Sequence, residues 1–191
     1  MFNLPPVTKA LIIINGLVFF AEGTLGSPII SFFALWPFGP QFAPWQMLTY
    51  AFIHGGLTHL LFNMFGIYMF GSDVERVWGG RRYLSYYLAC ALAAAASQLA
   101  VSSLTGAYYP TVGASGALFG LLLAFAILFP NRVVIPLFPP IPMRAPVFVA
   151  VYGALELVLG VTGTQAGVAH FAHLGGLAGG YLFMRFWQSW R

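Results

Sequence analysis

The sequence predicts an all-α membrane protein, a bundle of six transmembrane helices that forms a single domain over residues 1–191. First, 60% of its residues are hydrophobic and only 6% are charged, whereas charged residues make up ~25% of an ordinary soluble domain. A soluble domain of this size buries only ~70% of its unfolded surface, so a soluble globular protein is excluded. Second, the length accommodates about six spans of ~20 residues each. Third, a chain with six spans would place all eight of its basic residues on one side of the membrane.

The predicted spans are apolar runs that end at glycine, proline or a charged residue. They cover residues 7–23, 57–70 and 83–104, then the stretch from Gly113 to Pro130, then residues 145–161 and 168–186. A cleavable signal peptide is the alternative for the first run, because Lys9 precedes the apolar stretch. Ala21-Glu22-Gly23 is a poor cleavage site, so a retained span is favoured.

The eight basic residues predict the orientation, because cytoplasmic connections carry the excess of Lys and Arg. With six spans, all of them fall on one side: Lys9, Arg76, Arg81, Arg82, Arg132, Arg144, Arg185 and Arg191. Both termini are therefore expected in the cytoplasm. The net charge of +4 comes from basic residues that are too scattered to form a patch for nucleic acid.

Two connections have distinctive compositions. Residues 24–56 contain Trp36, Trp45 and four prolines but almost no charge, which predicts a segment lying in the outer membrane interface. Residues 130–146 contain six prolines and two arginines, which predicts an extended strap. The single cysteine, Cys90, excludes an intramolecular disulfide and a thiolate metal site.

Uncharged polar residues gather at the predicted outer ends of spans two and four. His59 and Asn63 are four residues apart, so they share one face of a helix. Ser115 begins span four between Gly113 and Gly116, where first-turn N–H groups are free and small neighbours leave room for a substrate. Taken alone, the first pair is better interpreted as an interhelical polar clamp and the second as a packing site.

Span six contains His173, the residue that suggests a catalytic reaction. His173 and Gly176 lie on one stripe of this span, and the glycine lets the span approach span four closely. A neutral histidine is suited to take the proton of a serine near pH 7. His59, Asn63 and the N–H of Ser115 are available to bind a developing oxyanion. These residues together predict a Ser115–His173 dyad.

A third member of a triad is harder to find in the sequence. Asp73 and Glu75 lie at the cytoplasmic end of span two and Glu22 lies near the outer end of span one, so Glu156 in span five is the acidic residue that could approach His173. The preferred interpretation makes Glu156 a neutral or hydrogen-bonded structural residue. A dyad is preferred to a triad.

The motifs occur in a specific order along nearly the whole chain. They are His59-Leu-Leu-Phe-Asn63, Glu75-Arg76-Val-Trp-Gly79-Gly80-Arg81-Arg82-Tyr83, Gly113-Ala-Ser115-Gly116, and Ala172-His173-Leu-Gly-Gly176 with Gly180. In this order they resemble the HxxxN motif, the cytoplasmic turn, the GxSG motif and the AHxxGxxxG motif of the rhomboid family of intramembrane serine proteases. No single motif is decisive, but the ordered set is specific.

The resemblance implies a rhomboid-like six-helix bundle with a sunken, water-filled active site. In it Ser115 is the nucleophile, His173 is the general base and acid, and His59 and Asn63 are oxyanion donors. Phe119 stands where an aromatic residue, Tyr in many members, stacks on the catalytic histidine. Neither a metal nor an organic cofactor is implied.

One loop residue departs from the family pattern. Trp45-Gln46 stands where the first loop commonly carries Trp-Arg. The anchoring contacts of this loop are therefore left open by the resemblance, whereas the catalytic chemistry is unaffected.

The leading functional hypothesis is an endopeptidase that cleaves transmembrane helices of single-span or multi-span membrane proteins near their outer ends. The resemblance implies that substrates arrive laterally from the lipid bilayer, past the outer parts of spans two and five. A bacterial or archaeal cell membrane is the expected location. The alternatives are a non-proteolytic binder of membrane helices and, less favoured, a transporter or channel in which His59, His173 and Glu156 line an ion path.

Overall fold

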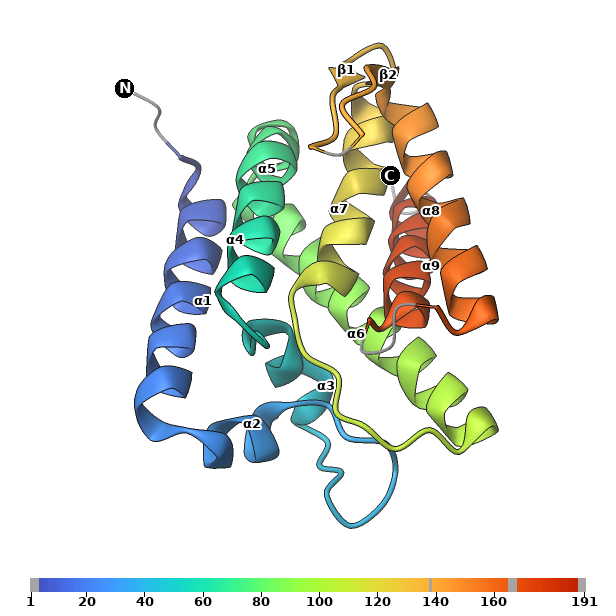
Figure 1. The fold of residues 1–191 in the computed structure, drawn as a ribbon. Coiled ribbons are helices and arrows are strands. Elements are labelled where there is room, and N and C mark those ends of the chain that lie inside the picture. The colour runs from blue at the N-terminus through green and yellow to red at the C-terminus, as the bar shows by residue number, and fades with distance from the viewer. Residues whose placement is uncertain (1–3, 138, 165–167, 189–191) are drawn as a thin grey trace.

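The structure, a computed structural model, describes residues 4–137, 139–164 and 168–188 and is mostly helical (Figure 1). The elements in chain order are α1 (Pro6–Leu25), α2 (Ser27–Phe33), α3 (Gln46–Thr49), η1 (Tyr50–Phe52), α4 (Leu57–Gly66), η2 (Ile67–Gly71), α5 (Ser72–Trp78), α6 (Gly80–Thr105), α7 (Ser115–Leu128), β1 (Val133–Val134), β2 (Met143–Arg144), α8 (Ala145–Thr162) and α9 (His170–Gln188). All six predicted apolar runs are helical over most of their length. The second run continues beyond residue 70, through η2 into α5.

Three of the described helices, α1, α6 and α8, are long and apolar enough to cross a membrane, and α7 is a shorter apolar helix. Only 22% of the most apolar stretch of α1 and 11% of that of α8 are buried. Their exposed side chains include Leu17, Phe20, Leu155, Val158 and Val161. Apolar surface on this scale is stable when it faces lipid rather than water.

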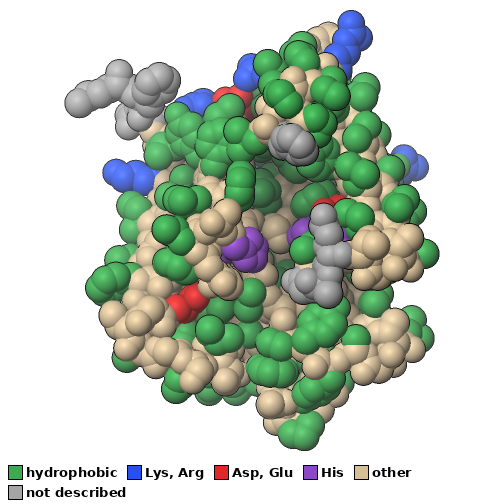
Figure 2. Space-filling view, viewed as in Figure 1, with side chains coloured by type: hydrophobic (Ala, Val, Ile, Leu, Met, Phe, Trp, Pro, Cys, Tyr) green, Lys and Arg blue, Asp and Glu red, His purple; other side chains and the backbone are tan. Residues whose placement is uncertain are grey.

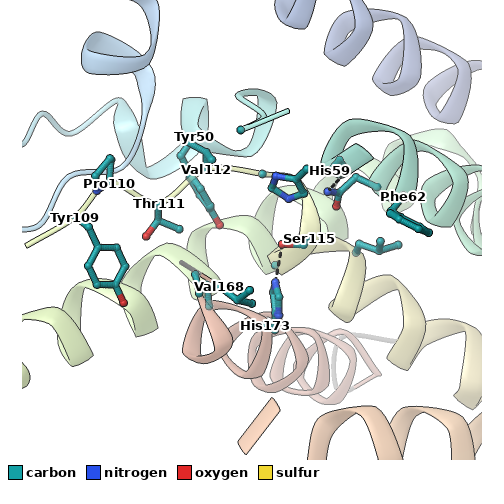
Figure 3. Close-up of a pocket in the computed structure, with 17 residues that line it drawn as sticks. Tyr50, His59, Phe62, Tyr109, Pro110, Thr111, Val112, Ser115, Val168 and His173 are labelled. Carbon is teal, nitrogen blue, oxygen red and sulfur yellow. Dashed lines mark hydrogen bonds between the residues drawn. The ribbon is translucent and has the colours of Figure 1, made fainter. Parts of the chain in front are cut away.

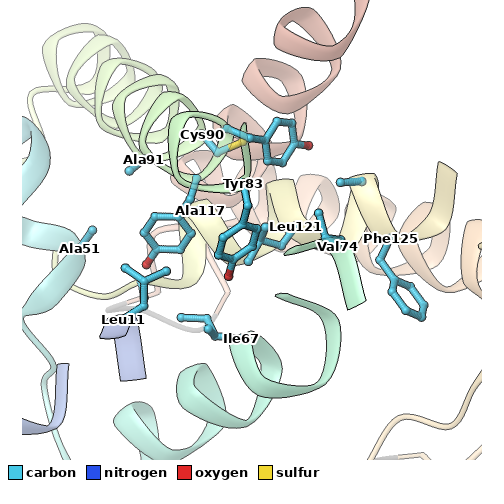
Figure 4. Close-up of a cluster of buried hydrophobic side chains, with 14 of the residues drawn as sticks. Leu11, Ala51, Ile67, Val74, Tyr83, Cys90, Ala91, Ala117, Leu121 and Phe125 are labelled. Carbon is cyan, nitrogen blue, oxygen red and sulfur yellow. The ribbon is translucent and has the colours of Figure 1, made fainter. Parts of the chain in front are cut away.

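Helix α6 lies behind α7 and α9 and carries much of the core (Figure 1; Figure 4). Tyr83, Tyr86 and Cys90 are fully buried on one face of this helix. The hydroxyl group of Tyr86 donates a 2.7 Å hydrogen bond to the carbonyl oxygen of Gly120 in α7. A buried tyrosine is stable when its hydroxyl group finds such a partner, and this bond fixes α6 against α7.

Helices α7 and α9 meet backbone to backbone. A Cβ atom added at Gly176 in α9 would overlap the carbonyl oxygen of Gly116 in α7. A Cβ atom at Gly120 would overlap the sulfur of Cys90 in α6. Small residues at such crossings let helices pack closely, and this close packing sets the distance between the first turns of α7 and α9.

Two buried glutamates attach the ends of α1 to the rest of the bundle. Glu75 in α5 accepts hydrogen bonds from the backbone N–H groups of Val7 and Thr8 at 2.9 and 2.6 Å and from the Thr8 hydroxyl at 2.7 Å. A carboxylate is favourable there because the amino end of a helix carries free N–H groups and a partial positive charge. At the other end, Glu22 accepts a 3.1 Å hydrogen bond from the backbone N–H of His54.

The connection over residues 24–56 is folded and anchored by Gln46. The Gln46 side-chain oxygen accepts hydrogen bonds from the backbone N–H groups of Ala43 at 3.1 Å and Trp36 at 3.3 Å. Its amide nitrogen donates to the carbonyl oxygen of Gln41 at 2.9 Å. Although Gln46 departs from the family pattern, it anchors the loop, because both the oxygen and the nitrogen of its amide group bond to the loop backbone.

The same connection is joined to the segment that leads into α7. Leu35 and Thr111 exchange two backbone hydrogen bonds of 2.9 and 3.0 Å. The position of the residues before α7 therefore depends on the folded loop.

The proline-rich connection after α7 contains a short antiparallel pair, in which β1 pairs with β2. Arg132 at its start contacts Asp73 of α5 through a 2.6 Å ion pair. Lys and Arg side chains lie in the upper half of Figure 2, at the end where α1 begins. Arg191, one of the predicted cytoplasmic charges, lies outside the described residues.

Candidate active site

Ser115 is the first residue of α7, and a glycine turn places it there. Gly113 adopts φ +116°, a conformation that side-chain-bearing residues rarely take. A Cβ atom at Gly113 would lie 2.6 Å from Cε1 of His59. Only glycine therefore permits both the turn and the approach of the His59 ring to the backbone just before Ser115.

Ser115 and His173 come together from α7 and α9. The Ser115 Oγ atom lies 2.7 Å from the His173 Nε2 atom (Figure 3), which is the separation that proton transfer between a nucleophile and its base requires. The Phe119 ring stacks on the His173 ring with centroids 4.5 Å apart and planes 8° apart. Phe119 lies one helical turn after Ser115, so the same helix supplies the Ser115 hydroxyl group and packs against the imidazole.

A cavity of about 500 Å³ opens beside this pair. The predicted residues Gly113, Ser115, Gly116, His59, Asn63 and His173 all line it. Figure 3 shows His59 projecting from α4 toward the region of Ser115, with His173 on the opposite side. Figure 2 shows histidine side chains at a hollow in this face of the molecule. The hollow gives a substrate backbone space to reach Ser115.

The predicted oxyanion donors lie on α4. The Asn63 side-chain nitrogen donates a 2.9 Å hydrogen bond to the carbonyl oxygen of His59. An amide nitrogen carries two hydrogens, so one remains for a ligand in the cavity. Asn63 is thus held in place by its own helix while it faces the cavity that Ser115 and His173 share.

His54 supports His59 from behind. Its ring packs edge to face on that of His59 with centroids 5.1 Å apart, and it is 2% exposed. Burial, and secondarily the neighbouring His59, lower the pKa of His54 from 6.5 to about 4. His54 is therefore neutral at physiological pH and brings no charge to the site.

Several cavity residues carry no sequence motif. Tyr50 lines the cavity, and its hydroxyl group donates a 2.8 Å hydrogen bond to the carbonyl oxygen of Ala91 in α6. Burial raises the pKa of Tyr50, so its hydroxyl group stays protonated. Phe62 and Val168 also line the cavity. Their positions depend on how the helices cross, which residue spacing alone does not reveal.

Glu156 lies beside His173, on the side of the ring away from Ser115. Its Oε2 atom is 2.9 Å from His173 Nδ1 and 2.6 Å from His170 Nδ1. His170 is in hydrogen-bond geometry with this oxygen, whereas His173 Nδ1 is close to it without good alignment. Glu156 is hydrogen-bonded, as the sequence suggested, but it also contacts the dyad histidine, which the preferred interpretation did not include.

Glu156, His170 and His173 are also residue types that bind metal ions, and their candidate ligand atoms lie within 4.8 Å of one another. Two ligand atoms on one tetrahedral zinc ion are about 3.3 Å apart, because each bond to the metal is ~2.0–2.1 Å. The carboxylate oxygen lies 2.6 and 2.9 Å from the two imidazole nitrogens. These separations fit hydrogen-bonded groups better than metal ligands.

Comparison with known proteins agrees with the order of the motifs. The model of the Rhomboid domain family matches residues 41–188. Rhomboid protease GluP of Bacillus subtilis is 31% identical over 143 residues, covering 72% of this chain and 25% of GluP. Putative rhomboid protease YdcA of the same organism is 36% identical over 92 residues, covering 47% of this chain and 45% of YdcA.

Rhomboid protease GlpG of Klebsiella pneumoniae is 34% identical over 76 residues, covering 39% of this chain and 28% of GlpG. The chain therefore spans less than half the length of each of these three relatives. The family match covers most of the chain, and it includes Ser115, His173 and both predicted oxyanion residues. This chain is an integral membrane protein that belongs to the rhomboid family.

Proposed function

We propose that this protein is an intramembrane serine endopeptidase that cleaves the transmembrane helices of other membrane proteins near their outer ends. The observation that carries the proposal is the 2.7 Å contact between Ser115 Oγ and His173 Nε2, beside a cavity of about 500 Å³. The similarity to two proteins named rhomboid protease and to one named putative rhomboid protease supports the same reaction class.

The proposed reaction begins when Ser115 Oγ attacks the scissile carbonyl carbon and its proton passes to His173 Nε2. The carbonyl oxygen becomes an oxyanion, which accepts hydrogen bonds from first-turn N–H groups of α7, His59 and Asn63. Collapse of this intermediate breaks the C–N bond, and the leaving amine takes the proton from His173. Water then attacks the acyl-enzyme with His173 as base, which releases the carboxylic acid and restores Ser115.

Substrates are proposed to arrive laterally, past α4. Phe62 lines both the catalytic cavity and a second groove of about 330 Å³, whose other residues are Thr58, Leu61, Phe65 and Leu137. Leu61 and Phe62 are 58% and 56% exposed. This apolar path between lipid and the cavity supports a membrane helix as the substrate. Because a peptide bond within a helix is hydrogen-bonded and covered, the substrate must unwind locally, so helix-breaking residues near the cleaved bond are expected.

We further propose that six spans cross the membrane, with both termini cytoplasmic and residues 24–56 in the outer interface. The whole chain, residues 1–191, then forms one rhomboid domain in the cell membrane of a bacterium or archaeon. The concentration of basic side chains at one end of the bundle supports this orientation.

Labelling with a serine-reactive fluorophosphonate distinguishes a protease from a protein that merely binds membrane helices. The folded wild type is expected to be labelled at Ser115, and Ser115→Ala and His173→Ala are expected to lose the label, because the serine needs its base to react. If folded wild-type protein resists the probe while a known serine hydrolase in the same membranes reacts, the non-proteolytic alternative is favoured.

A further inference from the structure

The carboxylate of Glu156 lies on the side of the His173 ring away from Ser115, where the acidic member of a catalytic triad would lie. The His173 Nε2 atom faces Ser115 at 2.7 Å, and its Nδ1 atom faces Glu156 Oε2 at 2.9 Å. The two contacts therefore use opposite sides of one ring. Glu156 comes from α8, so three separate helices contribute to this line of polar groups.

The tautomer of His173 explains why the carboxylate matters. Nε2 can accept the Ser115 proton only if the neutral ring carries its own proton on Nδ1. In the buried imidazole, Nδ1 has no hydrogen-bond partner among the described residues, and the atom it approaches is the Glu156 oxygen. Catalytic hydrogen bonds are often poorly aligned before substrate binds and tighten afterwards. The carboxylate therefore favours the tautomer that catalysis requires.

His170 fixes the carboxylate in this position. Its Nδ1 atom lies 2.6 Å from the same Glu156 oxygen, and its Nε2 atom lies 3.3 Å from the carbonyl oxygen of Thr164. His170 is 5% exposed, so its ring is largely shielded from water. It precedes His173 by nearly one helical turn, and the two rings therefore approach the carboxylate from one helix.

Among the described groups that face His173, Glu156 supplies the negative charge. The ring is stacked on Phe119 and faces Ser115 from α7, Glu156 from α8, His170 on its own helix and, across the cavity, His59 from α4. The imidazolium that forms during acyl transfer is stabilised by a carboxylate at this distance, and more strongly where little water is present.

We propose that Glu156 is a positioning residue that extends the dyad to a Ser115–His173–Glu156 relay, with His170 holding the carboxylate. The proposal rests on the proposed protease function. Glu156 sets the tautomer and orientation of His173 and stabilises the imidazolium, and it does not contact the substrate. His173 exchanges protons with Ser115, the leaving amine and the attacking water, and no proton passes to Glu156, so the carboxylate stays ionised throughout.

The test compares cleavage of a single-span substrate in liposomes by wild type, Glu156→Gln and Ser115→Ala across pH. Glu156→Gln keeps the shape of the side chain and removes its charge. Its kcat is expected to fall roughly 10- to 1,000-fold with little change in KM. The acid limb of its pH–rate profile is expected to move to lower pH, because less negative charge faces the imidazolium. A merely structural role would not move this limb.

Asp73→Asn is the matched control, because Asp73 is a partly exposed carboxylate paired with Arg76 and Arg132 outside the cavity. This variant should keep wild-type kcat and acid limb. If Glu156→Gln also keeps both while Ser115→Ala is inactive, the relay is wrong and the protease proposal stands. If Ser115→Ala itself cleaves at the wild-type rate, the failure belongs to the protease proposal instead.

A measurement on the wild type keeps the relay testable even if Glu156→Gln does not fold. Nitrogen-15 NMR of histidine-labelled protein, with each ring assigned by a His→Gln substitution, reports which nitrogen of His173 is protonated. The relay predicts a proton on Nδ1 in the neutral ring. A neutral His173 protonated on Nε2 would overturn it.

Discussion

Gly113 is a position at which a single added methyl group would affect the proposed site, because that group would meet the ring of His59. The imidazole of His59 lies against the Gly113 backbone, immediately before the proposed nucleophile Ser115. This contact holds both the proposed oxyanion donor and the turn that leads into Ser115. The polar groups of the cavity are therefore positioned by a residue that has no side chain.

We expect Gly113→Ala to lower kcat about 100-fold, because the added methyl group would displace His59 and an oxyanion donor is worth roughly that much. Gly106→Ala is the matched control. Gly106 also has positive φ, at +71°, but a Cβ atom there meets nothing within 4 Å. Gly106→Ala should lose about 1–2 kcal/mol of stability through backbone strain, and Gly113→Ala should lose more because its methyl group also meets His59, but only Gly113→Ala should lose activity in the liposome assay. Equal activity of the two would contradict this role of Gly113.

The grouping of Ser115, His173, His59 and Asn63 around one cavity could be predicted from sequence, because these residues belong to motifs with fixed spacing. The contact between Glu156 and His173 could not, since it depends on how α8 crosses α9. The same limit applies to Tyr50 and to the backbone contacts of Gln46. These residues carry no motif, and their partners lie on other elements or across a folded loop.

At the scale of elements, the attachment of α1 depends on one buried carboxylate in α5. Apolar runs predicted the helices well, because each run ends at a glycine, a proline or a charge. The second apolar run predicted an end at residue 70, which is too early, because the helical segment continues to Trp78. Glu75 is 3% exposed within that extension. A charged residue can be buried there because the amino end of α1 supplies its hydrogen-bond donors.

Glu75→Gln is expected to lower the free energy of unfolding by roughly 2–4 kcal/mol, because an amide NH₂ group would face backbone N–H donors that now contact an oxygen. Thermal unfolding in detergent measures this loss. Asp73→Asn again serves as control, since its ion pairs are partly exposed and such pairs contribute ~0–1 kcal/mol. Similar losses for the two variants would show that the contact with α1 contributes little.

At the scale of the whole molecule, the basic side chains and the proposed catalytic residues lie in different parts of the bundle. Basic side chains lie around one end, whereas Ser115 and His173 lie at the first turns of helices that run toward that end. Exposed apolar side chains on α1 and α8 face outward between the two ends. This arrangement is expected of a protein that holds a water-accessible site within a membrane and opens it to the outer side.

Cysteine labelling tests the proposed orientation. Leu104, at the end of α6, is 87% exposed, and Ile135, after β1, is 62% exposed. Leu104→Cys should react with a membrane-impermeant maleimide in intact cells, whereas Ile135→Cys should react only after permeabilisation. The native Cys90 is buried and gives a low background. The reverse pattern would place the site on the cytoplasmic side and contradict the orientation.

The central claim, cleavage of a membrane helix by Ser115 with His173 as its base, is tested most directly by co-expression with a panel of tagged single-span substrates. Wild type is expected to release a fragment whose new end, read by mass spectrometry, lies in the outer part of the substrate helix. Ser115→Ala and His173→Ala are expected to release none while they accumulate in the membrane as folded protein. Fragment release by either variant at the wild-type rate would contradict the account.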